Sequence, residues 1–135
     1  MCQVVTVESL SPRARLVQSY LAHWASSTDP ARPFTGRIAY SKLCTTLDPQ
    51  RQYWMPRRYK GIGPVLAEVG SYEHAHGRPI LPALVVRKHS GRPGTGFADL
   101  ARSLGEQVVP GQEVEFWRAE VERVISYWTS LEPRT

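Results

Sequence analysis

Apolar residues recur every three or four positions over several stretches of the chain, and polar runs rich in glycine and proline separate these stretches. This spacing places the apolar residues on one face of a helix, so the pattern predicts a mostly helical fold. The first stretch predicts a helix from Pro12 to about Ser26. Its start is favoured because Ser11 can cap it and because proline loses no hydrogen bond at a first helical position.

The middle of the chain carries two further helical patterns and one run of strand character. A short amphipathic helix is predicted over 40–47, and a longer one over 62–76 that ends at Gly77. The run ILPALVVR over 80–87 is short, apolar and bounded by proline and polar residues, which is typical of a buried strand. The segment KHSGRPGTG follows it and is predicted to be a turn-rich loop.

Two more helices are predicted after this loop. A short helix should extend from Phe97 to Leu104, and a strongly amphipathic one should occupy most of 112–131. We interpret Trp117 and Trp128 in the second helix as core or dimer contacts. The outer face of this helix is predicted to be acidic, with Glu113, Glu115, Glu120 and Glu122.

The order of the elements over 36–97 is helix, connector, helix, strand and glycine-rich loop. This order is typical of a winged helix-turn-helix, in which a recognition helix and a wing contact nucleic acid. We therefore expect an α+β, mostly helical fold that forms a single domain over 1–135. The helix-turn-helix and wing would occupy 36–97, and the long amphipathic helix 112–131.

Basic charge is concentrated in the same central region. The chain has a net charge of +5, and residues 31–96 hold eleven Lys or Arg against three acidic residues. Residues 97–135 hold four Arg against seven acidic residues. Concentrated positive charge attracts phosphates and releases their counterions, which favours a nucleic-acid partner, with duplex DNA expected first. A solvated basic surface without a binding role would give the same count, so both interpretations stay open.

Basic and aromatic side chains are mixed in the connector over 48–60, DPQRQYWMPRRYK, which suits phosphate contact and stacking on bases. The alternative is that the aromatic residues fill the core and the arginines are only solvated. Glycines at the start of the next helix would let a phosphate approach its free N–H groups. The candidate nucleic-acid-binding residues are Arg51, Arg57, Arg58, Tyr59, Lys60, Gly61, Gly63, Ser71, Arg87, Lys88 and Arg92.

We expect no cofactor, no metal site and no catalytic activity. His74 and His76 are two positions apart and so do not share a helical face, which argues against a metal pair completed by His89. Cys44 lies on the apolar side of its helix and is interpreted as a small buried residue. Two cysteines, no signal-like start and no apolar run of about 20 residues predict a cytoplasmic protein without membrane contact.

Four short motifs occur in order along the central region: Tyr40-Ser41, Lys60-Gly61-Ile62-Gly63, Pro82-Ala83-Leu84-Val85 and Ser90-Gly91. In this order they resemble the DNA-binding domain of alkylguanine-DNA alkyltransferases and alkyltransferase-like proteins. The motifs correspond to its tyrosine-glycine helix start, its base-displacing arginine with the recognition-helix start, its Pro-Cys-His-Arg strand and its glycine wing. The resemblance covers under half of the chain and implies a winged-helix DNA-binding fold. Alkyl transfer is excluded because Ala83 stands where the nucleophilic cysteine would be.

Two functions remain open from the sequence. The first is a small basic nucleic-acid-binding protein without catalysis of its own. The second is a protein-interaction module, such as an accessory subunit or inhibitor of a nucleic-acid-handling complex in defence or repair, which docks or homodimerises through the C-terminal helix. Exposure of Trp117 or Trp128 would favour the protein-interaction module. Burial of both tryptophans, together with a continuous positive face, would favour the nucleic-acid-binding protein. The run from LPALVV to FWRAEVERVISYW is also similar to uncharacterised bacterial proteins, some beside nuclease or defence genes, which suggests a bacterial or phage origin.

Overall fold

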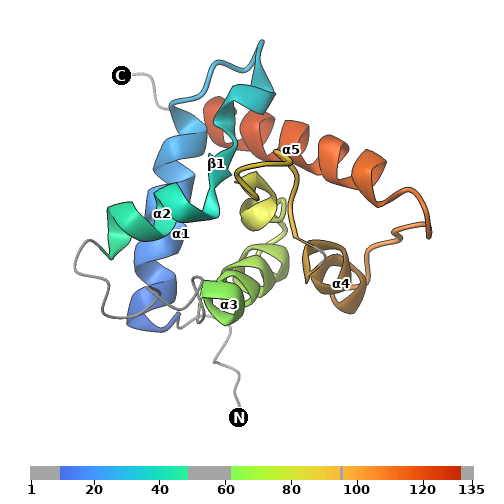
Figure 1. The fold of residues 1–135 in the computed structure, drawn as a ribbon, viewed down its shortest axis with the longest axis horizontal. Helices are drawn as coiled ribbons and strands as arrows, with labels where there is room; N and C mark the ends of the chain where they lie inside the picture. Colours follow the sequence, from blue (N-terminus) through green and yellow to red (C-terminus); the bar gives the residue numbers. More distant parts are fainter. Residues whose placement is uncertain (1–9, 49–61, 95, 132–135) are drawn as a thin grey trace.

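A computed structural model describes residues 10–48, 62–94 and 96–131 (Figure 1). These residues form five α-helices, two short 3-10 helices and one two-stranded sheet. The elements in chain order are α1 (Pro12–Ser26), η2 (Pro33–Gly36), β1 (Ile38–Ala39), α2 (Tyr40–Leu47), α3 (Ile62–Ala75), η3 (Leu81–Leu84), β2 (Val85–Val86), α4 (Gly96–Ser103) and α5 (Glu113–Ser130). The mostly helical α+β class expected from the sequence is confirmed.

The start of α1 follows from its capping residues. The Ser11 side chain accepts a hydrogen bond from the backbone N–H of Ala14 at 3.3 Å, and Pro12 occupies the first turn. The apolar face of the helix is fully buried at Val17 and Leu21. The predicted boundaries of this helix are therefore confirmed, and the same holds for α2, α3, α4 and α5 to within one or two residues.

The core is built around η3 and β2, which lie at the centre of the fold between α1, α3 and α5 (Figure 1). Leu81 and Leu84 of η3 are completely buried. The indole Nε1 of Trp117 on α5 donates a hydrogen bond to the Ala83 carbonyl at 2.8 Å, so the long helix is joined to this central segment by both apolar contact and a polar bond.

The strand predicted over 80–87 is wrong for most of its length. Leu81–Leu84 forms a 3-10 helix, and only Val85–Val86 is strand. Pro82 lies in the first turn of η3, where its fixed φ fits a helical turn and its missing N–H would weaken a strand ladder. An apolar run of this length does not separate a buried strand from a buried helical turn.

The two strands pair in parallel, with Ile38 opposite Val85 and Ala39 opposite Val86. No other strand pairing occurs in the part of the chain that the structure describes. The segment after β2 is a series of turns, as its composition predicted.

The predicted acidic outer face of α5 is wrong at Glu120, which is only 2% exposed. Its carboxylate accepts hydrogen bonds from the backbone N–H of Ile80 and from the Arg123 guanidinium, both at 2.7 Å. Burial raises the pKa of this carboxyl, and the hydrogen bond from Ile80 opposes the shift. Glu120 therefore satisfies the backbone at the entrance to η3 instead of facing solvent.

No helix within the described ranges is long and apolar enough to cross a membrane.

Candidate nucleic-acid interface

The parallel strand pair brings two distant parts of the chain to one edge of the sheet. Because β1 and β2 run in the same direction, their C-terminal ends lie together. Tyr40 opens α2 directly after β1, and Arg87 opens a loop directly after β2. A Cβ built on Gly94 would lie 3.6 Å from both the Arg87 guanidinium and the Tyr40 hydroxyl, so the first turn of α2 and the loop over 87–94 are in contact.

Backbone hydrogen bonds fold this loop back on itself. The N–H of Arg87 donates to the carbonyl of Arg92 at 2.8 Å, and the N–H of Gly91 donates to the carbonyl of Arg87 at 2.9 Å. Gly91 has a φ of 69°, which glycine adopts without strain. The loop is tied to the residue before β1 as well, because the Arg37 guanidinium donates to the Gly91 carbonyl at 3.0 Å and to the Phe34 carbonyl at 2.8 Å.

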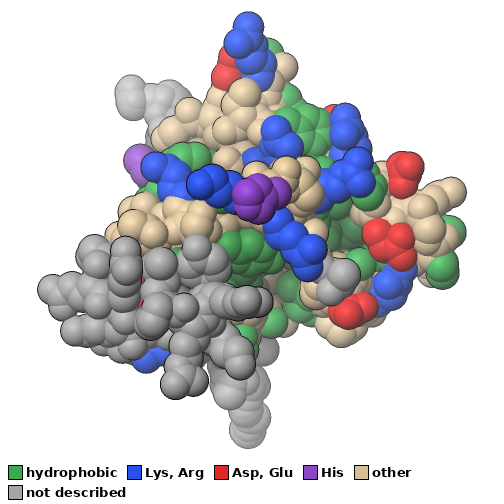
Figure 2. Space-filling view, viewed as in Figure 1, with side chains coloured by type: hydrophobic (Ala, Val, Ile, Leu, Met, Phe, Trp, Pro, Cys, Tyr) green, Lys and Arg blue, Asp and Glu red, His purple; other side chains and the backbone are tan. Residues whose placement is uncertain are grey.

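Five exposed cations come from the segments that flank β1 and from the loop after β2, and we call them the cationic face. They are Arg37, Lys42, Arg87, Lys88 and Arg92. Figure 2 shows Lys and Arg side chains gathered in a band across this side of the molecule, while Asp and Glu side chains gather toward α4 and α5. Among the described residues, none of the five forms an ion pair with a carboxylate.

Three other arginines of the fold are matched to acidic residues. Arg78 binds the fully buried Glu73 at 2.7 Å, and Arg123 binds Glu120 at the same distance. Arg102 lies 3.0 Å from Glu113. These arginines have structural partners, whereas the cationic face keeps its charge available for a ligand. Arg15, Arg32 and Arg118 also have no carboxylate partner among the described residues, so the cationic face is distinguished by its grouping and not by the lack of ion pairs alone.

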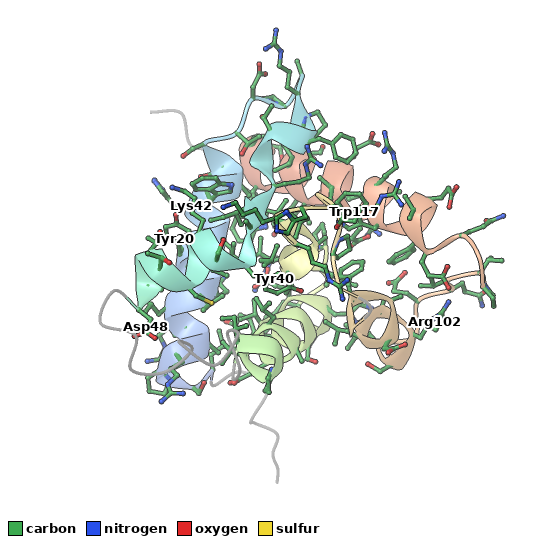
Figure 3. The ribbon with its side chains drawn as sticks, in the orientation of Figure 1. Tyr20, Tyr40, Lys42, Asp48, Arg102 and Trp117 are labelled. Atoms are coloured by element: carbon green, nitrogen blue, oxygen red, sulfur yellow. The ribbon has the colours of Figure 1, made fainter. Side chains whose placement is uncertain are left out.

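Tyr40 lies beneath the cationic face and is half-buried (Figure 3). Burial raises the pKa of its phenol, and a hydrogen bond from the Gly94 backbone and the nearby Arg87 charge oppose the shift. The hydroxyl therefore stays protonated at neutral pH and can donate a hydrogen bond at the edge of the face.

The structure brings three of the candidate residues together, namely Arg87, Lys88 and Arg92. The connector candidates Arg51, Arg57, Arg58, Tyr59, Lys60 and Gly61 lie outside the described residues. Gly63 is exposed in the first turn of α3 and shares a pocket of about 350 Å³ with Tyr40, which places it near the cationic face.

Ser71 is exposed on α3, but no contact in the described part of the chain joins it to the cationic face. It lies three positions from Glu68 and so on the same side of the helix. The Glu68 carboxylate accepts hydrogen bonds from the Ser11 N–H at 2.7 Å and from the Ser11 hydroxyl at 3.0 Å. That side of α3 is therefore directed toward the start of α1.

Sequence reasoning counted Arg37 and Lys42 in the basic region but did not single them out. Arg37 comes one residue before β1, and Lys42 lies in the first turn of α2. Their place beside the loop depends on the parallel pairing of β1 with β2, which joins segments 47 positions apart in the register. No local sequence motif predicts the pairing of β1 with β2, because this contact joins residues that are far apart in the sequence.

Three residues considered for catalysis or metal binding, His74, His76 and Cys44, have hydrogen-bond partners or are buried within the fold. Nε2 of His74 lies 3.2 Å from a Glu106 carboxylate oxygen, and Nδ1 of His76 lies 2.8 Å from the Tyr72 carbonyl. No group of three metal-ligating side chains occurs in the described residues. Cys44 is fully buried, as predicted, and burial first and Asp48 second raise the pKa of its thiol to about 12, which disfavours the nucleophilic thiolate.

Comparison of the chain with protein family models, curated proteins and solved structures gave no match.

Proposed function

We propose that this protein binds nucleic acid through the cationic face, with duplex DNA as the principal partner and without catalysis of its own. The observation that supports the proposal is the convergence of five exposed cations, without a carboxylate partner among the described residues, from two segments of the chain, Arg37 to Lys42 and Arg87 to Arg92. Phosphate contacts of this kind give affinity that does not depend on sequence, and they position a protein on its nucleic acid.

The binding mode that we propose is that of a winged helix. The α2 and α3 helices would form the helix-turn-helix pair, and the loop over 87–94 would serve as the wing. The order of these elements and the basic character of the loop support this assignment. In this arrangement Arg87, Lys88 and Arg92 contact the sugar-phosphate backbone beside the groove that receives α3.

The acidic side chains on α4 and α5 support an orientation in which the cationic face is directed toward the nucleic acid. Glu115 and Glu122 are exposed on α5, and Asp99 is exposed on α4. Carboxylates repel phosphate, so these helices are expected to lie away from the nucleic acid while the cationic face meets it. A cytoplasmic location is part of the proposal.

The protein-interaction alternative receives less support. An exposed tryptophan on α5 would favour it, but Trp117 is only 2% exposed and packs against η3. Trp128 is half-buried, with its ring edge-on to Tyr127. The apolar face of α5 is used within the fold, so it offers little surface for a partner or for a second copy of the chain.

The proposal is tested by titrating labelled duplex DNA, single-stranded DNA and RNA of equal length with the protein at several salt concentrations. We expect binding to duplex DNA that weakens steeply as salt is raised. Undetectable binding to every probe at low salt would refute the proposal, and tighter binding to RNA or to single strands would correct the choice of partner.

A further inference from the structure

A pocket of about 400 Å³ opens beside the cationic face, between the loop over 87–94, α4 and α5. The proposed winged-helix mode makes no use of it. Its walls include Arg87, Arg92, Phe97, Arg102, Val114 and Trp117. A volume of this size is within the range of pockets that bind small molecules.

The floor of the pocket is apolar, aromatic and fixed in position. Trp117 is held by its hydrogen bond to the Ala83 carbonyl, and its ring lies 6.0 Å from that of Phe34. Phe97 is buried and lies 6.1 Å from the Phe116 ring, measured between ring centres. Trp117 and Phe97 are only 2% and 8% exposed, so the floor that a ligand meets also includes Ala98 and Val114, and this preformed apolar surface can accept a ring system.

The two ends of the pocket differ in charge. At the loop end, Arg87 and Arg92 are exposed and have no carboxylate partner among the described residues. At the opposite end, Arg102 lies 3.0 Å from Glu113 and 4.0 Å from Asp99, so its charge is compensated (Figure 3). An anionic group is therefore attracted to the loop end, and the carboxylates at the far end can accept hydrogen bonds from amino groups.

We propose that this pocket binds a nucleoside monophosphate. The phosphate would be held by the guanidinium groups of Arg87 and Arg92, which have no carboxylate partner among the described residues, because the planar fork of arginine matches phosphate oxygens. The base would lie on the apolar floor, with an amino group directed toward Asp99 or Glu113. A free nucleotide and the phosphorylated end of a nucleic-acid strand both present a nucleoside monophosphate group. The proposal is that the pocket binds this group, whichever molecule carries it.

Occupancy of the pocket has a consequence for the proposed function. Arg87 and Arg92 belong to both the pocket and the cationic face, and a guanidinium that binds one phosphate is withdrawn from another. A bound nucleotide therefore competes with duplex DNA, a coupling that rests on the proposed function. Binding of the nucleotide itself does not rest on it.

Calorimetric titration of the full chain with the four ribonucleoside monophosphates tests the pocket directly. At least one of them is expected to bind tenfold or more tightly than its nucleoside and than inorganic phosphate, because ring and phosphate are held together. The pocket proposal is overturned if no nucleotide binds more tightly than inorganic phosphate.

Two variants and one control variant locate the binding site. Ala98 lines the pocket on α4, and Ala98→Trp should fill it and weaken nucleotide binding at least tenfold. Ala119→Trp adds the same side chain at an exposed position of α5 outside the lining and should bind like the parent. Arg92→Ala changes an exposed residue, so it tests the phosphate end even if Ala98→Trp fails to fold. Nucleotide affinity that is unchanged in Arg92→Ala and in folded Ala98→Trp would overturn the assignment.

Oligonucleotides distinguish the two sources of the ligand. A single strand with a 5′-phosphate that binds tenfold tighter than the same strand without it, in the parent but not in Ala98→Trp, assigns the pocket to a strand end. Equal binding of the two strands, with free nucleotide still bound, assigns it to the free molecule. Duplex binding without nucleotide binding would refute the pocket alone, and nucleotide binding without duplex binding would refute the proposed function alone.

Discussion

Removing the three cations of the loop gives the sharpest test of the cationic face. The variant carries Arg87→Ala, Lys88→Ala and Arg92→Ala, all at exposed positions. The backbone hydrogen bonds that shape the loop do not involve these side chains, and the Arg37 guanidinium still binds the Gly91 carbonyl. The variant is therefore expected to fold like the parent, with an unchanged melting temperature.

The magnitude follows from counterion release. Each phosphate neutralised on duplex DNA contributes about −0.9 to the slope of log affinity against log salt, so the five cations give about −4.5 and the loop variant loses about 2.7 of this slope. Between 50 and 200 mM salt, the parent should lose about 500-fold in affinity and the variant ~12-fold, if the five residues supply all the contacts. Contacts from elsewhere in the chain would add equally to both slopes, so the difference is the quantity to measure.

Fluorescence anisotropy of a labelled duplex, repeated over a series of salt concentrations, gives both slopes. Arg15→Ala is the matched control, because Arg15 is exposed on α1 and its side chain binds only the Leu10 carbonyl among described residues. The control should keep the parental slope. A loop variant that is folded but keeps the parental slope, or an Arg15→Ala protein that loses as much as the loop variant, would refute the assignment of the interface.

Three further predictions concern the fold. Burial raises the pKa of Glu120 above its ordinary 4.5, so the stability that its carboxyl contributes is present below pH 4.5 and is lost as pH rises through the folded pKa. Glu120→Gln should therefore be more destabilising near pH 4 than near pH 7 in urea unfolding. An equal effect at both pH values would refute the raised pKa. A Cβ on Gly36 would lie 2.9 Å from a buried side-chain carbon of α5, so Gly36→Ala should cost about 1–3 kcal/mol, whereas Gly63→Ala, where a Cβ meets nothing within 4 Å, should cost nothing measurable by the same method. In a Cys2→Ser background, Cys44 of the folded protein should react with iodoacetamide on the order of a thousandfold more slowly than a free thiol at about pH 8. In denaturant it should react at the ordinary rate. Rapid reaction of the folded protein would contradict the raised pKa of the Cys44 thiol.

Local chemistry predicted the helices well because the signals for helix ends are short. Ser11 and Pro12 start α1, and Gly77 and Gly105, with φ of 74° and 96°, follow α3 and α4. Each signal involves residues within one turn of the helix end. Hydrophobic spacing likewise predicted α5, and of the two interpretations of Trp117, a core or a dimer contact, the structure shows the core contact.

The remaining features depend on contacts between distant residues and were predicted poorly. Glu120 reads as a surface residue on its own helix, and only the approach of Ile80 from a different element gives its carboxylate a buried partner. Arg37 reads as one basic residue among many until the pairing of β1 with β2 places it beside the loop. The prediction of a basic surface therefore came from composition, but the tertiary structure was needed to identify which residues form that surface.

The guanidinium of Arg37 has a double role that affects how the loop over 87–94 would respond to a bound phosphate. It donates to the Phe34 and Gly91 carbonyls in the unbound protein and is also exposed to an arriving anion. A guanidinium has five N–H donors, so an anion can bind the remaining donors while the bond to Gly91 stays in place. The tip of the loop would then stay tied to Arg37 in the complex, and amide exchange there should slow on binding.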